Sequence, residues 1–257
     1  MRTPAGGGEG VSCWCQDGGA TVLVRGGEVL RVEGEGGVAL LADLVAEGVM
    51  EAGDSVAGLA LLPDLPAVLV ATAGGALVQV ATSGLLEEVG EVAAGIAAMA
   101  VAPDLELVVL VTRDLKVVTM TREGVVVREE ALEGGGEGEG RQVSLGWGRK
   151  ETQFHGSEGK AAREVGVEAG RLVAGDDRRV RVSWRGDGQM VAVSYVAGEV
   201  GEERREVRVY TREGALYSSS QGVPGLEQSL AWRPSGAQIA VTVTRPNMQV
   251  SRGTGIY

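Results

Sequence analysis

Apolar and polar residues alternate along this chain in short runs that end in tight turns. The clearest runs are GLALLPDLPAVLV (58–70), AMAVAPDLELVVL (98–110), RVSWRGDGQMVAV (181–193) and LAWRPSGAQIAV (230–241). Each holds an alternating segment, a cluster of Pro, Gly, Asp or Ser, and a second apolar segment. A period of two residues is typical of a half-buried β-strand, and the turn cluster joins two such strands into a hairpin.

The same pattern recurs at a nearly constant spacing. Two weaker copies occupy 12–24 and 144–156. The bulky residue before each turn falls at Trp14, Leu61, Val101, Trp147, Trp184 and Trp232, and these anchor residues are 37 to 48 positions apart. That spacing, with several strands in each repeat, is typical of β-propeller blades. The sequence therefore predicts an all-β, WD40-like β-propeller in which the anchor residues form the core between blades.

Later strands and their turns follow the anchors. Two copies end their third strand with the same four letters, TREG, at 121–124 and 211–214. We expect Gly124 and Gly214 to take the positive φ that such hairpin turns need. The segment 197–206 is expected to form an extended hairpin tip, and 164–177 a longer irregular connection.

The number of repeats predicts an incomplete ring. About five full blades and a partial sixth fit into the 257 residues, whereas propellers have 4 to 8 blades and commonly about seven. We therefore expect a disordered amino terminus at 1–10 and a partial propeller over 11–257, as in a fragment of a longer protein.

Composition narrows the classes of function. Apolar residues make up 44% of the chain, enough for a core, and the net charge is −11. Because nucleic-acid-binding domains usually carry positive charge, binding of nucleic acid by the whole chain is disfavoured, although a local basic patch is compatible with this charge. The amino terminus lacks the apolar run of a signal peptide, and charges interrupt every apolar run before it could span a membrane. We expect a soluble protein with no membrane contact.

The sequence holds partial matches to catalytic and metal-binding motifs, but each lacks residues that the motif requires. HGSEG (155–159) lacks the first Gly of a nucleophile elbow, and no His follows it. The pair Gly159-Lys160 lacks both the earlier Gly and the following Ser or Thr of a P-loop. Cys13 and Cys15 are too few for a zinc site and too close for a disulfide. The sequence predicts a protein that is not an enzyme and that binds no cofactor or metal.

One stretch, GWGRKETQFHGSEG (146–159), differs from its surroundings. It holds the only His and the only Phe of the chain, and 141–163 carry five basic and two acidic residues within an acidic protein. A polar strand-turn-strand would explain it, and so would a contact surface. The residues predicted to bind a partner are Trp147, Arg149, Lys150, Gln153 and His155.

These residues also carry a resemblance. GWGRKETQFHGSEGKAA (146–162) is similar to a signature segment in the amino-terminal propeller of the Elongator complex protein 1 (IKAP) family. The likeness continues through 182–194, 207–240 and RPN (245–247), and it covers most of 12–247. The 146–159 block is the most specific part, and the remainder is typical of propellers in general.

The resemblance implies a non-catalytic scaffold subunit of Elongator, which supports modification of wobble uridines in tRNA. The implied partners are the other Elongator subunits, with tRNA reached indirectly through the complex, and the implied location is the cytoplasm, with the nucleus as a second compartment. The family's dimerisation region is not in this sequence. The 146–159 block is then expected to face a partner subunit, with RNA backbone as the weaker option.

One rival interpretation stays open, a generic β-propeller interaction module of another complex. An enzyme with a propeller domain would require a following α/β domain with a Ser, Asp and His set, and this sequence offers none.

Overall fold

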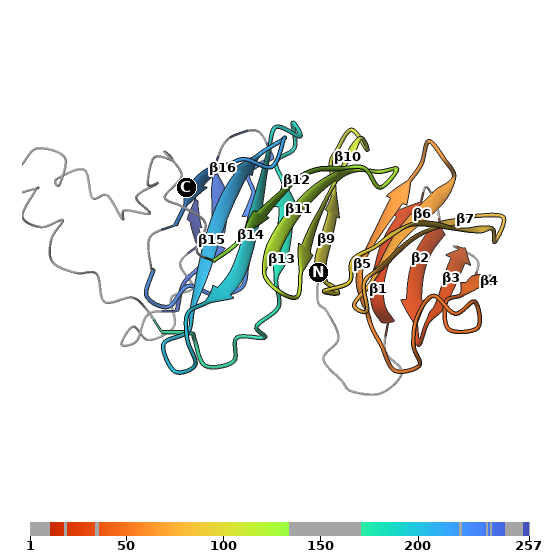
Figure 1. Cartoon of the computed structure of the whole chain (residues 1–257), viewed down its shortest axis with the longest axis horizontal. Coiled ribbons are helices and arrows are strands. Elements are labelled where there is room, and N and C mark those ends of the chain that lie inside the picture. Colours follow the sequence, from red (N-terminus) through yellow and green to blue (C-terminus); the bar gives the residue numbers. More distant parts are fainter. Residues whose placement is uncertain are drawn as a thin grey trace, which may run out of the picture. The chain divides into compact units, whose positions relative to one another are not determined.

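The computed structural model describes residues 11–17, 20–33, 36–133, 171–220, 223–234, 236, 238–244 and 254–256, with only the backbone at 11–17, 20 and 254–256. These residues fall into two compact units, one within 1–134 and the other within 135–257. All regular structure in the described residues is β-strand (Figure 1), so the predicted all-β class is confirmed. No helix among these residues is long and apolar enough to cross a membrane.

The first unit consists of three four-stranded antiparallel sheets. In each sheet the strands follow chain order, so that every connection is a hairpin between neighbours. The strands are β1 (Val11–Asp17), β2 (Ala20–Arg25), β3 (Glu28–Glu33) and β4 (Val38–Asp43); β5 (Val56–Leu62), β6 (Ala67–Thr72), β7 (Ala76–Ala81) and β8 (Leu86–Glu91); and β9 (Ile96–Val101), β10 (Leu107–Thr112), β11 (Lys116–Thr121) and β12 (Val126–Ala131).

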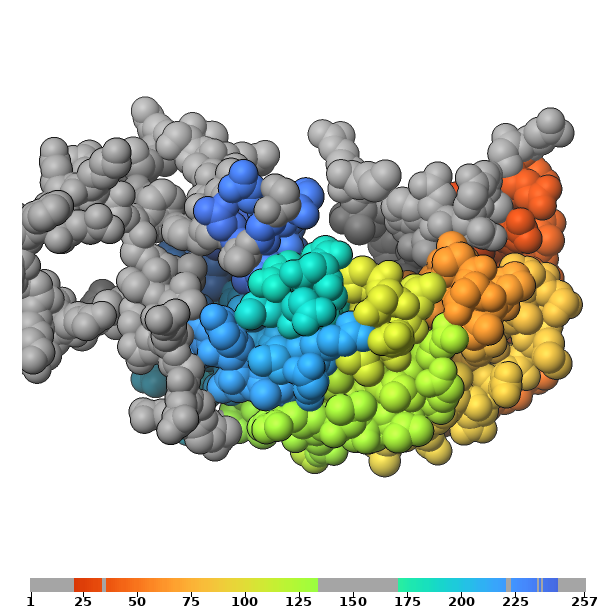
Figure 2. Space-filling model, turned by 90° about the horizontal axis from the view of Figure 1, so that it is seen from above, coloured from red at the N-terminus to blue at the C-terminus, as the bar shows by residue number. Residues whose placement is uncertain are grey.

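The first strands of these sheets lie beside one another, and the fourth strands lie outermost. β5 contacts both β1 and β9, whereas the residues of β8 and β12 are partly or fully exposed. Such a stack of twisted sheets, each with its first strand inside, is the arrangement of propeller blades. In Figure 2 the orange, yellow and green segments of this unit pack without a break.

The core of the first unit lies between its sheets. Val68 and Val70 of β6 pack into a cluster with residues of the first sheet, namely Val22, Val24 and Val29. The alternate residues Leu69 and Ala71 pack into a second cluster with residues of the third sheet, namely Ile96, Val108 and Leu110. Both faces of β6 are therefore buried, which explains why AVLVAT is a continuous apolar run without polar alternation.

The TREG turns have the predicted geometry. Gly124 has a φ of 92° and Gly214 a φ of 84°. In both turns the Gly N–H donates to the Thr carbonyl three residues earlier, at 3.0 and 2.9 Å respectively. A Cβ at Gly124 would lie 2.5 Å from the carbonyl oxygen of Val89, so glycine is required there for space as well as for its backbone conformation.

The second unit contains one four-stranded and one three-stranded sheet. The strands are β13 (Arg181–Trp184), β14 (Met190–Ala197), β15 (Arg204–Thr211) and β16 (Leu216–Ser219); and β17 (Ala231–Trp232), β18 (Ile239–Thr242) and β19 (Thr254–Ile256). Ala192 and Val207 of the first sheet pack against Leu226 and Val241. The predicted hairpin tip at 197–206 is confirmed, because β14 and β15 pair along their whole length around it.

The anchor prediction holds in position but not in burial. Leu61, Val101, Trp184 and Trp232 each lie on the first strand of a sheet, yet each is only half-buried. Leu61, Val101 and Trp232 do pack against the hydrophobic clusters between sheets, as predicted. The longest runs of buried residues lie instead on the second strands, β6, β10 and β14, although first strands also hold single buried residues such as Leu62 and Ile96. A second strand is covered by strands at both edges and by sheets on its faces, whereas a first strand is an edge of its own sheet. The predicted copy at 144–156 and the segment 1–10 lie outside the described residues.

Candidate interaction site: an arginine–aspartate cluster in the second unit

The predicted partner-binding residues lie outside the described part of the chain. Trp147, Arg149, Lys150, Gln153 and His155 all belong to the interval 134–170. Their role stays a prediction. The most highly charged arrangement in the described residues is instead the segment 176–181, DDRRVR, which leads into β13.

Two aspartates fold this segment onto itself. The backbone N–H of Arg178 donates to Asp176 Oδ1 at 2.7 Å, and that of Arg179 donates to Asp177 Oδ1 at 3.1 Å. Hydrogen bonds from a backbone N–H to an Asp side chain two residues earlier are typical of Asx turns. Arg178 takes a φ of 57°, which is uncommon outside glycine, and the two turns hold it there.

A buried ion pair joins this segment to the sheet. Arg205 of β15 donates from Nε to Asp176 Oδ2 at 2.7 Å and from Nη2 to Asp176 Oδ1 at 2.5 Å. Its Nη1 donates to the carbonyl oxygen of Arg179 at 3.1 Å and to Ser194 Oγ on β14 at 3.2 Å. The two charged side chains are 0% and 1% exposed, respectively. Each guanidinium nitrogen of Arg205 therefore has an acceptor, as a buried charge requires.

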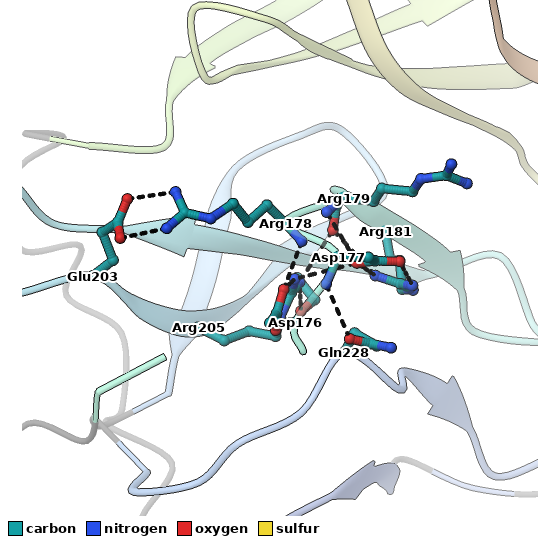
Figure 3. Close-up of polar contacts among 9 residues, drawn as sticks. Asp176, Asp177, Arg178, Arg179, Arg181, Glu203, Arg205 and Gln228 are labelled. Atoms are coloured by element: carbon teal, nitrogen blue, oxygen red, sulfur yellow. Dashed lines mark hydrogen bonds and ion pairs between the residues drawn. The ribbon is translucent and has the colours of Figure 1, made fainter. Parts of the chain in front are cut away.

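Two further pairs flank the buried one. Arg178 binds both oxygens of Glu203 at 2.6 Å, and Arg181 binds the two oxygens of Asp177 at 3.0 and 2.6 Å. The side-chain oxygen of Gln228, from the segment before β17, accepts the backbone N–H of Asp177 at 3.4 Å. The segment is thus tied to β15, to Glu203 in the turn before it, and to Gln228 in the connection that precedes β17 (Figure 3).

The electrostatics of the cluster suit binding rather than proton transfer. Hydrogen bonds from Arg205, Arg181 and Arg178 lower the pKa of Asp176, Asp177 and Glu203, respectively. These carboxylates therefore stay ionised at neutral pH and cannot act as general acids there. In the described ranges no three His, Cys, Asp or Glu side chains converge as a metal site would require.

Arg179 differs from the other charged residues of the cluster. Its side chain is exposed, and in the described part of the chain its guanidinium makes no hydrogen bond or ion pair. Figure 3 shows it pointing away from the carboxylates that bind its neighbours. The cluster holds four Arg against three carboxylates, and Arg179 carries the charge in excess.

Sequence reasoning missed this cluster. The segment 164–177 was expected to be an irregular connection, and its described part, from residue 171, indeed contains no strand. A signal existed in the complementary charges of DDRR (176–179) and EERRE (202–206). Pairing between residues 29 positions apart, as for Asp176 and Arg205, depends on which strands meet and cannot be read from local spacing.

A polar pocket lies in the first unit, where the connections between strands meet. It has a volume of about 510 Å³ and is lined by the 49–54 segment, the β6–β7 turn, Glu91 and Arg113. Asp54, one of its carboxylates, accepts the backbone N–H of Gly74 at 2.8 Å. That carboxylate therefore serves to hold the β6–β7 turn.

Comparisons with known proteins agree on one family. The family described as "ELP1 first N-terminal beta-propeller" matches residues 21–251. Elongator complex protein 1 of Rattus norvegicus is 44% identical over 209 residues, which are 80% of this chain and 16% of that protein. The Saccharomyces cerevisiae protein of the same name is 35% identical over 186 residues, or 61% of this chain and 14% of that protein. The chain thus spans about a sixth of the length of the curated relatives.

A solved structure supports the fold alone. The β-propeller domain of Cps50 (Swd1) from Myceliophteria thermophila superposes with a TM-score of 0.54 at 12% identity, covering 88% of this chain and 64% of that domain. At this identity the likeness shows a shared propeller architecture and nothing about function.

Proposed function

This chain belongs to the Elongator complex protein 1 family, in the region of its first amino-terminal β-propeller, and we propose that it acts as a non-catalytic scaffold of Elongator. In this role it holds other subunits of the complex, and through them it supports the modification of wobble uridines in tRNA. Contact with tRNA is indirect, and the complex works in the cytoplasm. The family match over 21–251 is the observation that carries the proposal.

The architecture is suited to such a role. Within each unit, stacked sheets with buried second strands form a packed core, and the connections between strands are typical places for partner contacts. The charged cluster around Arg205 has partners for all its carboxylates and offers no group that would titrate near neutral pH. Fixed charges on a packed unit favour recognition of a partner over chemistry on a substrate.

The proposal is tested in cells that express this protein. Disruption of its gene should strongly reduce the modified forms of wobble uridine, measured by mass spectrometry of digested tRNA, and the reintroduced gene should restore them. Unchanged wobble uridines after disruption would contradict the role in tRNA modification. Re-expression with normal protein levels but no recovery would also contradict it.

A further inference from the structure

Arg179 has a backbone held by hydrogen bonds, and its guanidinium makes no ion pair with the described residues. We propose that Arg179 is a contact residue for a carboxylate group on a protein partner of this chain. The inference rests on the proposed function, because the partner is then another subunit of Elongator. Three observations lead to it, namely the anchoring of the backbone, the cost of the buried ion pair and the charge around the site.

The backbone of Arg179 is held from both sides. Its N–H donates to Asp177 Oδ1 at 3.1 Å, and its carbonyl oxygen accepts hydrogen bonds from Arg205 Nη1 at 3.1 Å and from Arg181 Nη1 at 3.2 Å. A side chain that leaves a fixed backbone has less conformational freedom to lose on binding. The guanidinium of Arg179 is therefore better prepared for a partner than one on a loose loop.

The buried pair of Arg205 and Asp176 has a positional role. Taking two charges out of water is costly, and well-packed apolar residues in their place would often give equal or greater stability. A gain in stability therefore does not explain why this ion pair is buried here. It does fix the segment 176–181 against β14 and β15, because Arg205 binds Asp176 and the carbonyl of Arg179 together. The pair therefore determines where Arg179 is displayed.

The number of available cations favours a carboxylate on a protein over an RNA backbone. The three ionised carboxylates of the cluster are each paired with another Arg, and the whole chain has a net charge of −11. RNA binding depends on several cations that neutralise successive phosphates, whereas among the described residues of this site only the guanidinium of Arg179 is without an ion pair. A single Arg fork matches a single carboxylate, with which it can form two parallel hydrogen bonds.

The experiment compares four forms of the full chain, which are wild type, Arg179→Glu, Arg179→Lys and Arg233→Glu. Arg233 is the matched control, because it is exposed in the same unit and its guanidinium binds only the neutral side chain of Gln238 among the described residues, at 2.7 Å. The affinity of each form is measured for the purified Elongator subunits other than Elongator complex protein 1, and separately for a labelled oligouridylate. Thermal melting of each variant confirms that it is folded.

Arg179→Glu should raise the Kd for the other subunits at least about tenfold, as expected for an Arg that anchors an interface. Arg179→Lys should raise it less, since it keeps the charge but loses the fork, and Arg233→Glu should stay within about twofold. Equal affinity of Arg179→Glu and wild type would overturn the inference and leave the scaffold role intact. An equal loss of affinity in Arg233→Glu would show that the effect comes from net charge and not from Arg179, and it would also overturn the inference.

Two other results have distinct meanings. A loss of oligouridylate binding in Arg179→Glu, without a loss of subunit binding, would assign the residue to RNA and overturn the protein contact. A wild-type chain that fails to bind the other subunits would contradict the proposed function itself, and the inference with it.

Discussion

Replacing Asp176 by Ala should expose the energetic role of the buried ion pair. The change removes two hydrogen bonds from Arg205 and one from the backbone N–H of Arg178. It leaves the guanidinium, 0% exposed, with the carbonyl of Arg179, Ser194 Oγ and the more distant carboxylate of Asp177, at 3.8 Å. Loss of one partner of a buried pair costs about 3–5 kcal/mol, and the lower end is expected here because Asp177 still compensates part of the charge on Arg205. The matched change Asp177→Ala removes a partner whose side chain is 34% exposed, and should cost about 1 kcal/mol or less.

Hydrogen exchange of the full chain, followed by mass spectrometry, measures this difference within the second unit. Peptides from β14 and β15 should exchange about two to three orders of magnitude faster in Asp176→Ala, since about 1.4 kcal/mol corresponds to a factor of ten. In Asp177→Ala the exchange rate of the same peptides should rise at most about fivefold. The double change Asp176→Leu with Arg205→Met should recover most of the lost protection. Equal effects of the two single changes would refute the buried pair as described.

Three further outcomes are expected. Arg205 lowers the pKa of Asp176 below its ordinary 3.8. The stability that this pair contributes should therefore be complete above about pH 4 and should be lost as the pH drops through the lowered pKa. Urea unfolding at a series of pH values should show that the free energy of unfolding falls less steeply with pH in Asp176→Asn than in wild type. Gly124→Ala, at φ 92° and facing a carbonyl at 2.5 Å, should cost about 1–3 kcal/mol in thermal melts, and more than Gly48→Ala, at φ 73° with nothing within 4 Å. Trp232→Phe removes the 2.8 Å hydrogen bond from Nε1 to the carbonyl of Ser183 and should cost about 1 kcal/mol; an unchanged melting temperature would show that this bond does not join the two sheets.

Alternation and turn chemistry were sufficient to predict the sheets. They placed the hairpins of both units and the positive φ of Gly124 and Gly214, because these features depend on residues close in sequence. The anchors pack against the core clusters, but they are less buried than predicted, for a reason that local sequence does not show. Bulk at Trp184 and Trp232 marked the repeat, but burial depends on the number of neighbouring strands, which favours the second strand of each sheet.

The candidate site could be predicted only in part. The 146–159 block carried the family resemblance, and the family match over 21–251 confirms that resemblance. Whether Arg149 or Lys150 contacts a partner stays a prediction. The cluster of Asp176, Arg178 and Arg205 needed the structure, since its charges come from segments that meet only after β14 and β15 have paired.

Isolation of the protein from its own cells tests the central claim most directly. The chain is tagged at its genomic locus and purified under mild salt, and the intact assemblies are weighed by native mass spectrometry. The account predicts that the tagged protein comes mainly as one assembly whose mass is accounted for by Elongator subunits. A tagged protein that is found alone, or with partners unrelated to Elongator, would contradict the account.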